Sequence, residues 1–225
     1  MKEFYIIANW KARLTLPETS DWLNTFKKYY KTTSDNLKII LAPSATNLHI
    51  TSEFIKNNKL NLSVSAQDVS SYPKGAYTGE VPAELIKSLA EYAIIGHSER
   101  RRYFNETTAV LEKKLKQCRL NNLTTIYCFE KSSDALITAS DIIAFEPRSA
   151  IGTGKNLDPD SLLKIKQNLS ISNKPFLYGG SVNLANALDY LKIKSLINGF
   201  LISSASLNPI KFAQIIELIN QHLNK

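Results

Sequence analysis

The amino-acid sequence predicts an α/β fold, a closed (β/α)8 barrel that spans residues 1–225 as one domain. Short apolar runs alternate with longer helical patterns, and strands separated by helices form parallel sheets with right-handed crossovers. The runs start 34, 24, 30, 32, 18, 34 and 23 residues apart, and a terminal helix completes eight strand–helix units. Within the runs apolar and polar residues alternate only weakly, as in strands buried on both faces. The predicted strands are residues 4–8, 38–42, 62–66, 92–96, 124–128, 142–145, 176–179 and 199–202.

Several helices have recognisable starts. Pro17 and Glu18 open a predicted helix after the first strand, with Trp22, Leu23 and Phe26 on its apolar face. Farther along the chain, Asn105 is the predicted cap of a helix whose inner face carries Val110, Leu111, Leu115 and Cys118. Asn208 and Pro209 begin the last helix, whose core face carries Phe212, Ile215, Ile216, Ile219 and Leu223. The interval of 18 residues after residue 124 leaves little room for a helix, so we expect a shortened fifth helix region.

Length and composition favour a folded protein with a large core. Of the 225 residues, 44% are hydrophobic and 21% are charged, which is typical of globular domains. The formal charge of +8 comes from lysines scattered along the chain, which indicates solvated helix faces rather than a nucleic-acid-binding tract. Such a field would steer a small anionic substrate toward the protein.

Cysteine usage and the terminal sequence suggest a location. Cys118 and Cys128 have neither a disulfide framework nor metal-ligand spacing, so we expect a reducing compartment and no metal. The chain enters a strand-like run directly after its first residues, and no apolar stretch is long enough to cross a bilayer. We therefore expect a cytoplasmic protein with no membrane or nucleic-acid partner.

Polar residues gather at the ends of the predicted strands, where barrels of this kind place their active sites. Asn9 and Lys11 follow the first strand, His97 follows the fourth, and Glu146 follows the sixth. The loops after the last two strands are amide-rich, and they contain Gly179-Gly180-Ser181 and Ser203-Ser204. A carboxylate, an imidazole, a cation and two such loops suit proton abstraction next to the carbonyl of a phosphorylated substrate.

His97 is the most informative of these residues. It lies where a strand ends and a helix can begin, and there the backbone N–H groups and the helix dipole oppose a positive charge on the imidazole. A neutral imidazole can donate a hydrogen bond to an oxygen that gains negative charge during a reaction. The position therefore favours an electrophilic role for His97.

Seven segments together resemble the triosephosphate isomerase family over nearly the whole chain. They are Asn9-Trp10-Lys11, Ser65-Ala66-Gln67-Asp68, Gly75-Ala76-Tyr77-Thr78-Gly79-Glu80, Ile95-Gly96-His97-Ser98-Glu99-Arg100-Arg101, Glu146-Pro147, Ala150-Ile151-Gly152-Thr153-Gly154 and Tyr178-Gly179-Gly180-Ser181-Val182. The resemblance implies a TIM barrel that interconverts dihydroxyacetone phosphate and D-glyceraldehyde 3-phosphate, a step of glycolysis and gluconeogenesis. It also implies that no cofactor is needed.

The resemblance implies a role for each residue of the set. Glu146 removes a proton from the carbon beside the carbonyl and returns it to the neighbouring carbon. His97 polarises the carbonyl and moves protons between the enediol oxygens. Lys11 balances the phosphate and the developing enediolate, Asn9 orients the carbonyl end and supports His97, and Glu99 pairs with Lys11.

The loops have implied roles as well. Phosphate is bound by backbone amides of Gly152, Ser181, Ser203 and Ser204. Residues 147–155 form a closing lid, with hinge freedom from Gly152 and Gly154, which excludes water from the enediolate. The long loop at residues 67–81 inserts into a second subunit, so we expect a homodimer in which Thr78 reaches the neighbouring site.

The chain departs from the family pattern in two places. The lid usually carries an apolar residue and a tryptophan after its proline, where this chain has Arg148 and Ser149. Ser203 and Ser204 replace a usual pair of glycines after the eighth strand, and each serine adds a Cβ near the phosphate position. We expect the amide donors to survive and phosphate affinity to fall modestly, if at all.

Two other functions fit parts of the same pattern. An aldolase-like barrel could use Lys11 as a Schiff-base lysine. The altered lid and the serine pair also leave room for a catalytically impaired barrel kept as a binding protein. Borohydride trapping with substrate and a turnover assay discriminate these alternatives from isomerisation.

Overall fold

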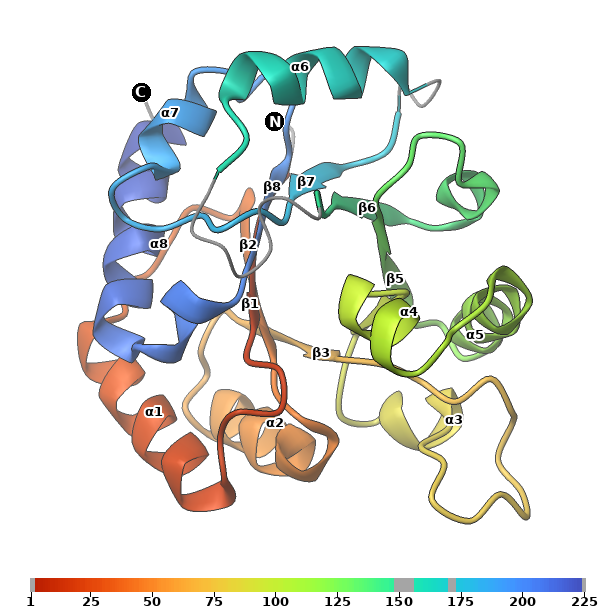
Figure 1. The fold of residues 1–225 in the computed structure, drawn as a ribbon. Helices are drawn as coiled ribbons and strands as arrows, with labels where there is room; N and C mark the ends of the chain where they lie inside the picture. Colours follow the sequence, from red (N-terminus) through yellow and green to blue (C-terminus); the bar gives the residue numbers. More distant parts are fainter. Residues whose placement is uncertain (1–2, 148–155, 170–172, 224–225) are drawn as a thin grey trace.

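The computed structural model of this protein is a closed barrel of eight parallel strands (Figure 1). It describes residues 3–147, 156–169 and 173–223. Neighbouring strands pair in chain order, and the last strand pairs with the first. The strands are β1 (Phe4–Asn9), β2 (Leu37–Ala42), β3 (Ser63–Ala66), β4 (Tyr92–Ile95), β5 (Thr124–Phe129), β6 (Ile142–Phe145), β7 (Phe176–Tyr178) and β8 (Gly199–Ile202). The predicted fold class is confirmed, and each predicted strand ends within about one residue of an observed one.

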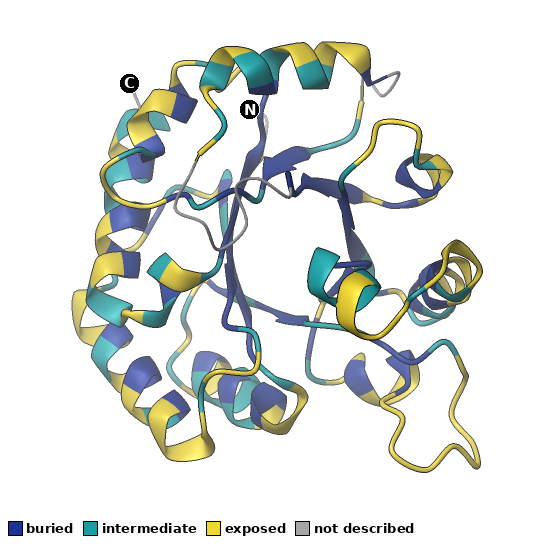
Figure 2. Cartoon of the chain, in the orientation of Figure 1, coloured by how far each residue is buried: buried dark blue, intermediate teal, exposed yellow. Residues whose placement is uncertain are grey.

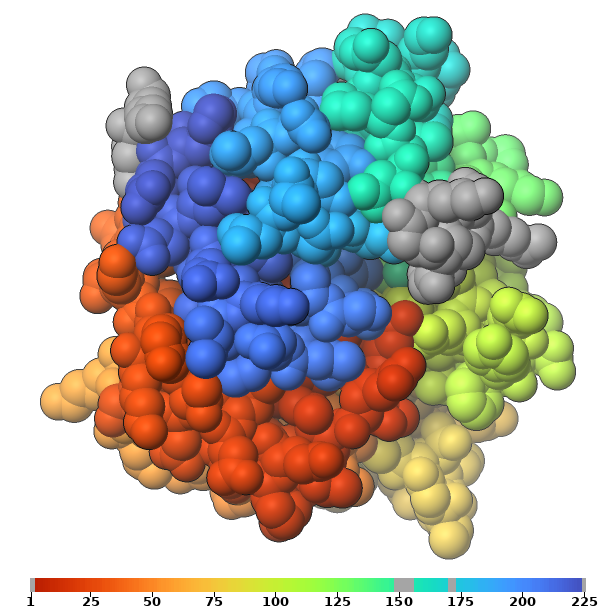
Figure 3. All heavy atoms as spheres, turned by 60° about the vertical axis from the view of Figure 1, so that its left-hand side comes forward, coloured from red at the N-terminus to blue at the C-terminus, as the bar shows by residue number. Residues whose placement is uncertain are grey.

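Helices surround the barrel and turn their buried faces toward it (Figure 2). Figure 3 shows α1 and α8 together on one face of the molecule. The α-helices are α1 (Leu16–Tyr29), α2 (Leu48–Asn57), α3 (Ala83–Ile86), α4 (Ser98–Tyr103), α5 (Thr108–Leu120), α6 (Pro159–Asn168), α7 (Ala187–Leu191) and α8 (Pro209–Leu223). Three 3-10 helices are η1 (Ala45–Asn47), η2 (Ala135–Ala139) and η3 (Ser204–Leu207). None of the helices in the described residues is both long and apolar enough to cross a membrane.

The starts of the first and last helices agree with the prediction, whereas the cap of α5 differs from it. Pro17 lies in the first turn of α1, and the Asn208 side chain accepts a hydrogen bond from the Lys211 amide at the start of α8. Asn105 is not the cap of α5, which corrects the prediction. Thr107 caps α5 by accepting from the Val110 amide at 3.4 Å, whereas Asn105 turns the chain with a φ of 53°.

The core has two parts. Outward-facing strand residues pack against the helices, and alternate residues of the same strands fill the barrel interior. The interior set is Tyr5, Ile7, Ile40, Ala42, Ile94, Ile126, Cys128, Ile142, Ala144, Leu177 and Leu201. The seam between β1 and β8 requires a glycine, because a Cβ on Gly199 would lie 2.0 Å from the carbonyl oxygen of Tyr5.

The fifth helix region is shortened, as predicted. Between β5 and β6 the chain forms only η2, which has five residues. The Asp134 side chain caps η2 by accepting a hydrogen bond from the Leu136 amide at 3.1 Å. This short segment brings Asp134 against the barrel next to Tyr127.

Candidate active site

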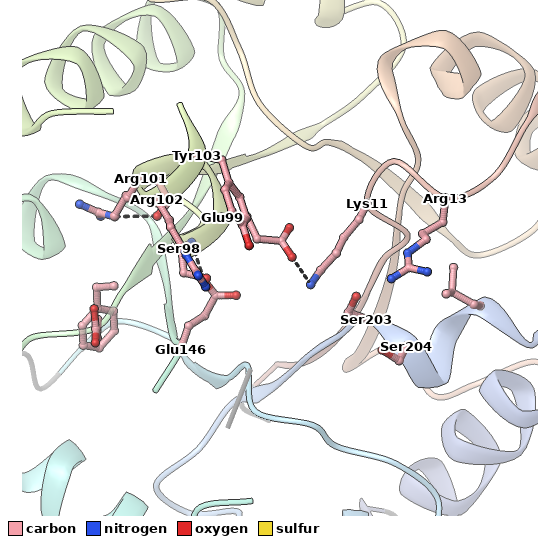
Figure 4. Close-up of a pocket in the computed structure, with 14 residues that line it drawn as sticks. Lys11, Arg13, Ser98, Glu99, Arg101, Arg102, Tyr103, Glu146, Ser203 and Ser204 are labelled. Atoms are coloured by element: carbon pink, nitrogen blue, oxygen red, sulfur yellow. Dashed lines mark hydrogen bonds and ion pairs between the residues drawn. The ribbon is translucent and has the colours of Figure 1, made fainter. Parts of the chain in front are cut away.

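The carboxyl ends of the strands surround a cavity of about 260 Å³. Asn9, Lys11, His97 and Glu146 line it, from the ends of β1, β4 and β6. It adjoins a larger cavity of about 660 Å³ that shares Lys11 and Glu146 (Figure 4). Ser181, Ser203 and Ser204 complete the set of predicted residues that line the smaller cavity. The structure thus brings together carboxylate, imidazole and ammonium from three separate strand ends.

His97 is buried at the junction of β4 and α4 and acts as the N-cap of that helix. Its Nδ1 accepts a hydrogen bond from the backbone N–H of Glu99 at 3.3 Å. Its Nε2 lies 2.9 Å from Oε1 of Glu146. Because Nδ1 accepts the bond from Glu99, the neutral form of the ring carries its proton on Nε2, which is the nitrogen that faces Glu146.

Glu146 follows β6 and is almost wholly buried. Its Oε2 accepts a hydrogen bond from the backbone N–H of Ser98 at 3.0 Å, and its own backbone N–H donates to the carbonyl of Phe129 at 2.9 Å. A Cβ on Gly179 would lie 3.0 Å from Cγ of Glu146. Glycine at that position therefore leaves room for the carboxylate.

The charges of His97 and Glu146 depend on each other. Burial lowers the pKa of His97, but the carboxylates of Glu146 and Glu99 together raise it more, so the pKa of His97 lies above its ordinary value. Burial likewise raises the pKa of Glu146, whereas the imidazole, the Ser98 amide and Lys11 lower it, and the net direction is down. Glu146 is therefore ionised, as a base that accepts a proton must be.

Contacts to its backbone and to its ammonium group hold Lys11 in place. Its φ is 54°, a left-handed conformation that a non-glycine residue adopts only when its surroundings impose it. The Asn9 side chain accepts from the Lys11 amide at 3.2 Å, and Gln67 donates to the Lys11 carbonyl at 2.9 Å. The Lys11 Nζ lies 2.7 Å from Oε1 of Glu99, the partner expected from the sequence. This strained turn directs the ammonium into the cavity.

Two of the predicted phosphate-binding residues, Ser203 and Ser204, lie on the side of the larger cavity opposite Glu146. Ser203 precedes η3 and Ser204 begins it, and both are drawn near Arg13 in Figure 4. Ser181 lies in the smaller cavity with a φ of 46°. Gly152, with the rest of residues 148–155 of the predicted lid, lies outside the described residues.

Sequence reasoning missed several residues that shape this site. Gln67 and Ser98 lie in segments that resemble the family, and both follow strand ends, but the sequence predicted no role in the site for either. Arg13 lines the larger cavity, and its only signal was its place two residues after Lys11. The Arg101 side chain makes four hydrogen bonds, to residues near the ends of β4 and β5 and to Asp134 at the start of η2. Its place in a matched motif was the one sequence signal for this role.

Comparison with known proteins identifies relatives of this chain. A family model described as triosephosphate isomerase matches residues 4–137 and 132–219. The triosephosphate isomerase of Mycoplasmopsis pulmonis is 33% identical, over 96% of this chain and 98% of that protein. The protein of the same name from Aquifex aeolicus is 32% identical, over 94% of this chain and 97% of its own length. The triosephosphate isomerase of Mesomycoplasma hyorhinis is 34% identical, over 97% of this chain and 99% of its own length.

Proposed function

Because this chain belongs to the triosephosphate isomerase family, we propose that Glu146, His97 and Lys11 carry out the proton transfers of its reaction. The protein is an isomerase that interconverts dihydroxyacetone phosphate and D-glyceraldehyde 3-phosphate. The observation that carries the proposal is the 2.9 Å contact between His97 and Glu146 in a cavity that also holds Lys11.

Glu146 is the base. Its carboxylate removes a proton from the carbon next to the substrate carbonyl, and it returns the proton to the neighbouring carbon. To reach that carbon, the carboxylate leaves the Ser98 amide and Nε2 of His97, which it contacts at 3.0 and 2.9 Å. The move frees the Nε2–H donor for the substrate oxygen.

His97 and Lys11 stabilise the intermediate. The Nε2–H of His97 donates to the oxygen on which negative charge develops, and the ring moves protons between the two enediol oxygens. Asn9 holds the backbone of Lys11 and orients the carbonyl end of the substrate. Lys11, held by Glu99, offsets the charge of the enediolate and of the phosphate.

The phosphate binds to backbone amides at the opposite side of the cavity. Ser181, Ser203 and Ser204 supply donors from the loops after β7 and β8, together with Gly152 of the lid. Arg13 and Lys11 make that side of the cavity positive, which favours an anionic substrate.

The protein acts as a homodimer. The long loop between β3 and α3 extends beyond the barrel (Figures 1 and 3). Within this loop the rings of Tyr72 and Tyr77 stack on each other with centroids 4.5 Å apart. Tyr77 and Thr78 are exposed in the single chain. This stiffened loop suits insertion beside Asn9 and His97 of a second copy.

A coupled turnover assay on glyceraldehyde 3-phosphate tests the base. We expect Glu146→Gln to lower kcat by roughly a thousandfold, since a positioned base contributes about 10²–10⁴-fold. Gln has nearly the same shape as Glu, so the variant should keep the wild-type fold. Circular dichroism of both proteins provides this control. Equal rates in the two proteins would remove Glu146 from the mechanism.

The two rival functions predict different results in labelling and turnover experiments. A Schiff-base aldolase would be labelled at Lys11 by borohydride in the presence of substrate, whereas the isomerase would not. A catalytically impaired binding protein would show no turnover in the wild type. The cytoplasmic location stays a prediction, which cell fractionation tests.

A further inference from the structure

Arg101 holds both peptide carbonyls that flank His97. Its Nε donates to the carbonyl oxygen of Gly96 at 2.8 Å, and its backbone N–H donates to the carbonyl oxygen of His97 at 3.2 Å. These two carbonyls fix the peptide planes before and after the His97 α-carbon. The orientation from which the imidazole enters the cavity is set by those planes.

The same guanidinium also reaches the next strand. Its Nη2 donates to the carbonyl oxygen of Cys128 at 2.9 Å, one residue before Phe129. The Phe129 carbonyl in turn accepts the backbone N–H of Glu146 at 2.9 Å. Arg101 therefore ties the end of β4, which carries His97, to the end of β5, which holds the backbone of the base.

Tyr127 and Asp134 hold the guanidinium in place. Nη2 of Arg101 lies 2.8 Å from the Tyr127 hydroxyl and 3.2 Å from Oδ2 of Asp134. The Tyr127 hydroxyl donates to Asp134 at 2.9 Å, and burial raises the pKa of that phenol, so the donor proton stays in place. Arg101 lines the larger cavity, but Figure 4 shows its guanidinium directed away from Lys11.

Gly96 makes this close approach possible. Its φ is 72°, and a Cβ there would lie 2.8 Å from Nη2 of Arg101 and 3.3 Å from the Tyr127 ring. A side chain at this position would displace the guanidinium. The backbone turn before His97 and the Arg101 contacts therefore depend on each other.

We propose that Arg101, braced by Tyr127 and by Asp134 of the shortened η2 segment, is a positioning residue that sets the orientation of His97 relative to Glu146. It acts through His97 and does not touch the substrate. Through Asp134, the shortened region between β5 and β6 would take part in positioning His97. This inference rests on the proposed function of His97 and Glu146.

Three variants remove successive parts of the brace. Tyr127→Phe removes the hydroxyl, Asp134→Asn removes the charge, and Arg101→Met removes every side-chain contact to the carbonyls. We expect kcat to fall by about tenfold in the first two and about a hundredfold in the third, because small misplacements of catalytic groups have effects of this size. KM should change by less than about twofold, since no substrate contact is lost.

Nitrogen-15 NMR of His97 gives a readout that stability alone would not move. At a pH above the raised pKa of His97, we expect the folded wild type to show one neutral ring with its proton on Nε2. In the variants we expect shifted or broadened ring signals at temperatures where they remain folded. Arg119→Met is the matched control, because Arg119 also donates to a backbone carbonyl, that of Ala139 in η2, at 3.2 Å. It should keep wild-type kcat.

The outcomes separate this inference from the proposed function. An active wild type whose Tyr127→Phe and Asp134→Asn variants retain kcat and the His97 signals, even with lower melting temperatures, overturns the positioning role alone. Wild-type protein with no turnover, or a fully active Glu146→Gln variant, overturns the proposed function instead. If Arg101→Met does not fold, the two milder variants decide the question.

Discussion

At the scale of single residues, the site depends on two buried groups that set each other's charge. Glu146 raises the pKa of His97, and His97 lowers the pKa of Glu146. The Glu99 amide at Nδ1 favours the ring form with its proton on Nε2. The ring is therefore neutral only above a pKa that the carboxylate has raised. In the proposed mechanism, movement of Glu146 to the substrate would lower that pKa and favour the neutral donor.

This coupling predicts a pH effect. Glu146→Gln removes the negative charge 2.9 Å from Nε2, so the pKa of His97 should fall and the ring should lose its charge at lower pH than in the wild type. Titration of the three histidines by NMR measures the shift, with His49 and His222 as internal references. A His97 pKa that stays the same or rises in the variant contradicts the coupling.

The serine pair after β8 gives a second residue-scale prediction. If Ser203 and Ser204 leave the amide donors intact, the double substitution Ser203→Gly and Ser204→Gly should change KM by less than about threefold, which is under about 1 kcal/mol of binding. Steady-state kinetics with each triose phosphate measure it. A sharp improvement in KM would mean that the added Cβ atoms already distort the phosphate site.

At the scale of elements, α5 shows how a cap is chosen. Thr107 has the extended backbone of an N-cap and accepts from the Val110 amide, whereas Asn105 has a left-handed backbone two residues earlier. A polar residue before an apolar helical pattern marks the region of a helix start. The backbone conformation then decides which of several polar residues becomes the cap.

Paired substitutions test that assignment. Thr107→Ala should lower the free energy of unfolding by about 1 kcal/mol, because one amide of the first turn loses its acceptor. Asn105→Gly should leave it nearly unchanged, since glycine adopts a positive φ without strain. Urea unfolding followed by circular dichroism measures both, and a larger loss at Asn105 would restore it as the cap.

At the scale of the whole molecule, the proposed homodimer depends on the loop at residues 67–81. Sedimentation velocity at micromolar concentration should give the mass of two chains. Thr78→Arg should shift the protein toward the monomer and lower kcat, because the loop tip no longer fits beside the neighbouring site. The same substitution at exposed Thr32, outside this loop, is the control. A monomeric wild type would exclude the proposed dimer.

The sequence by itself determined the barrel and several of the residues that line the cavity at the carboxyl ends of its strands. Apolar runs of strand length indicate strands that are buried on both faces. Their number and spacing favour a closed barrel, in which every strand edge is paired. Polar residues directly after those runs lie at one end of the barrel whatever the details of packing. Asn9, His97 and Glu146 could therefore be assigned to one site from their positions alone.

Only the tertiary structure decided which atoms meet. Gly96 follows β4 and Cys128 lies in β5, and the distances from their carbonyl oxygens to Arg101 are set by strand register and barrel closure, which no local pattern records. The pKa directions of His97 and Glu146 likewise follow from a 2.9 Å contact between residues 49 positions apart in sequence. Local sequence encodes burial and chain direction, whereas hydrogen bonds and charge coupling depend on distances that exist only after the barrel closes.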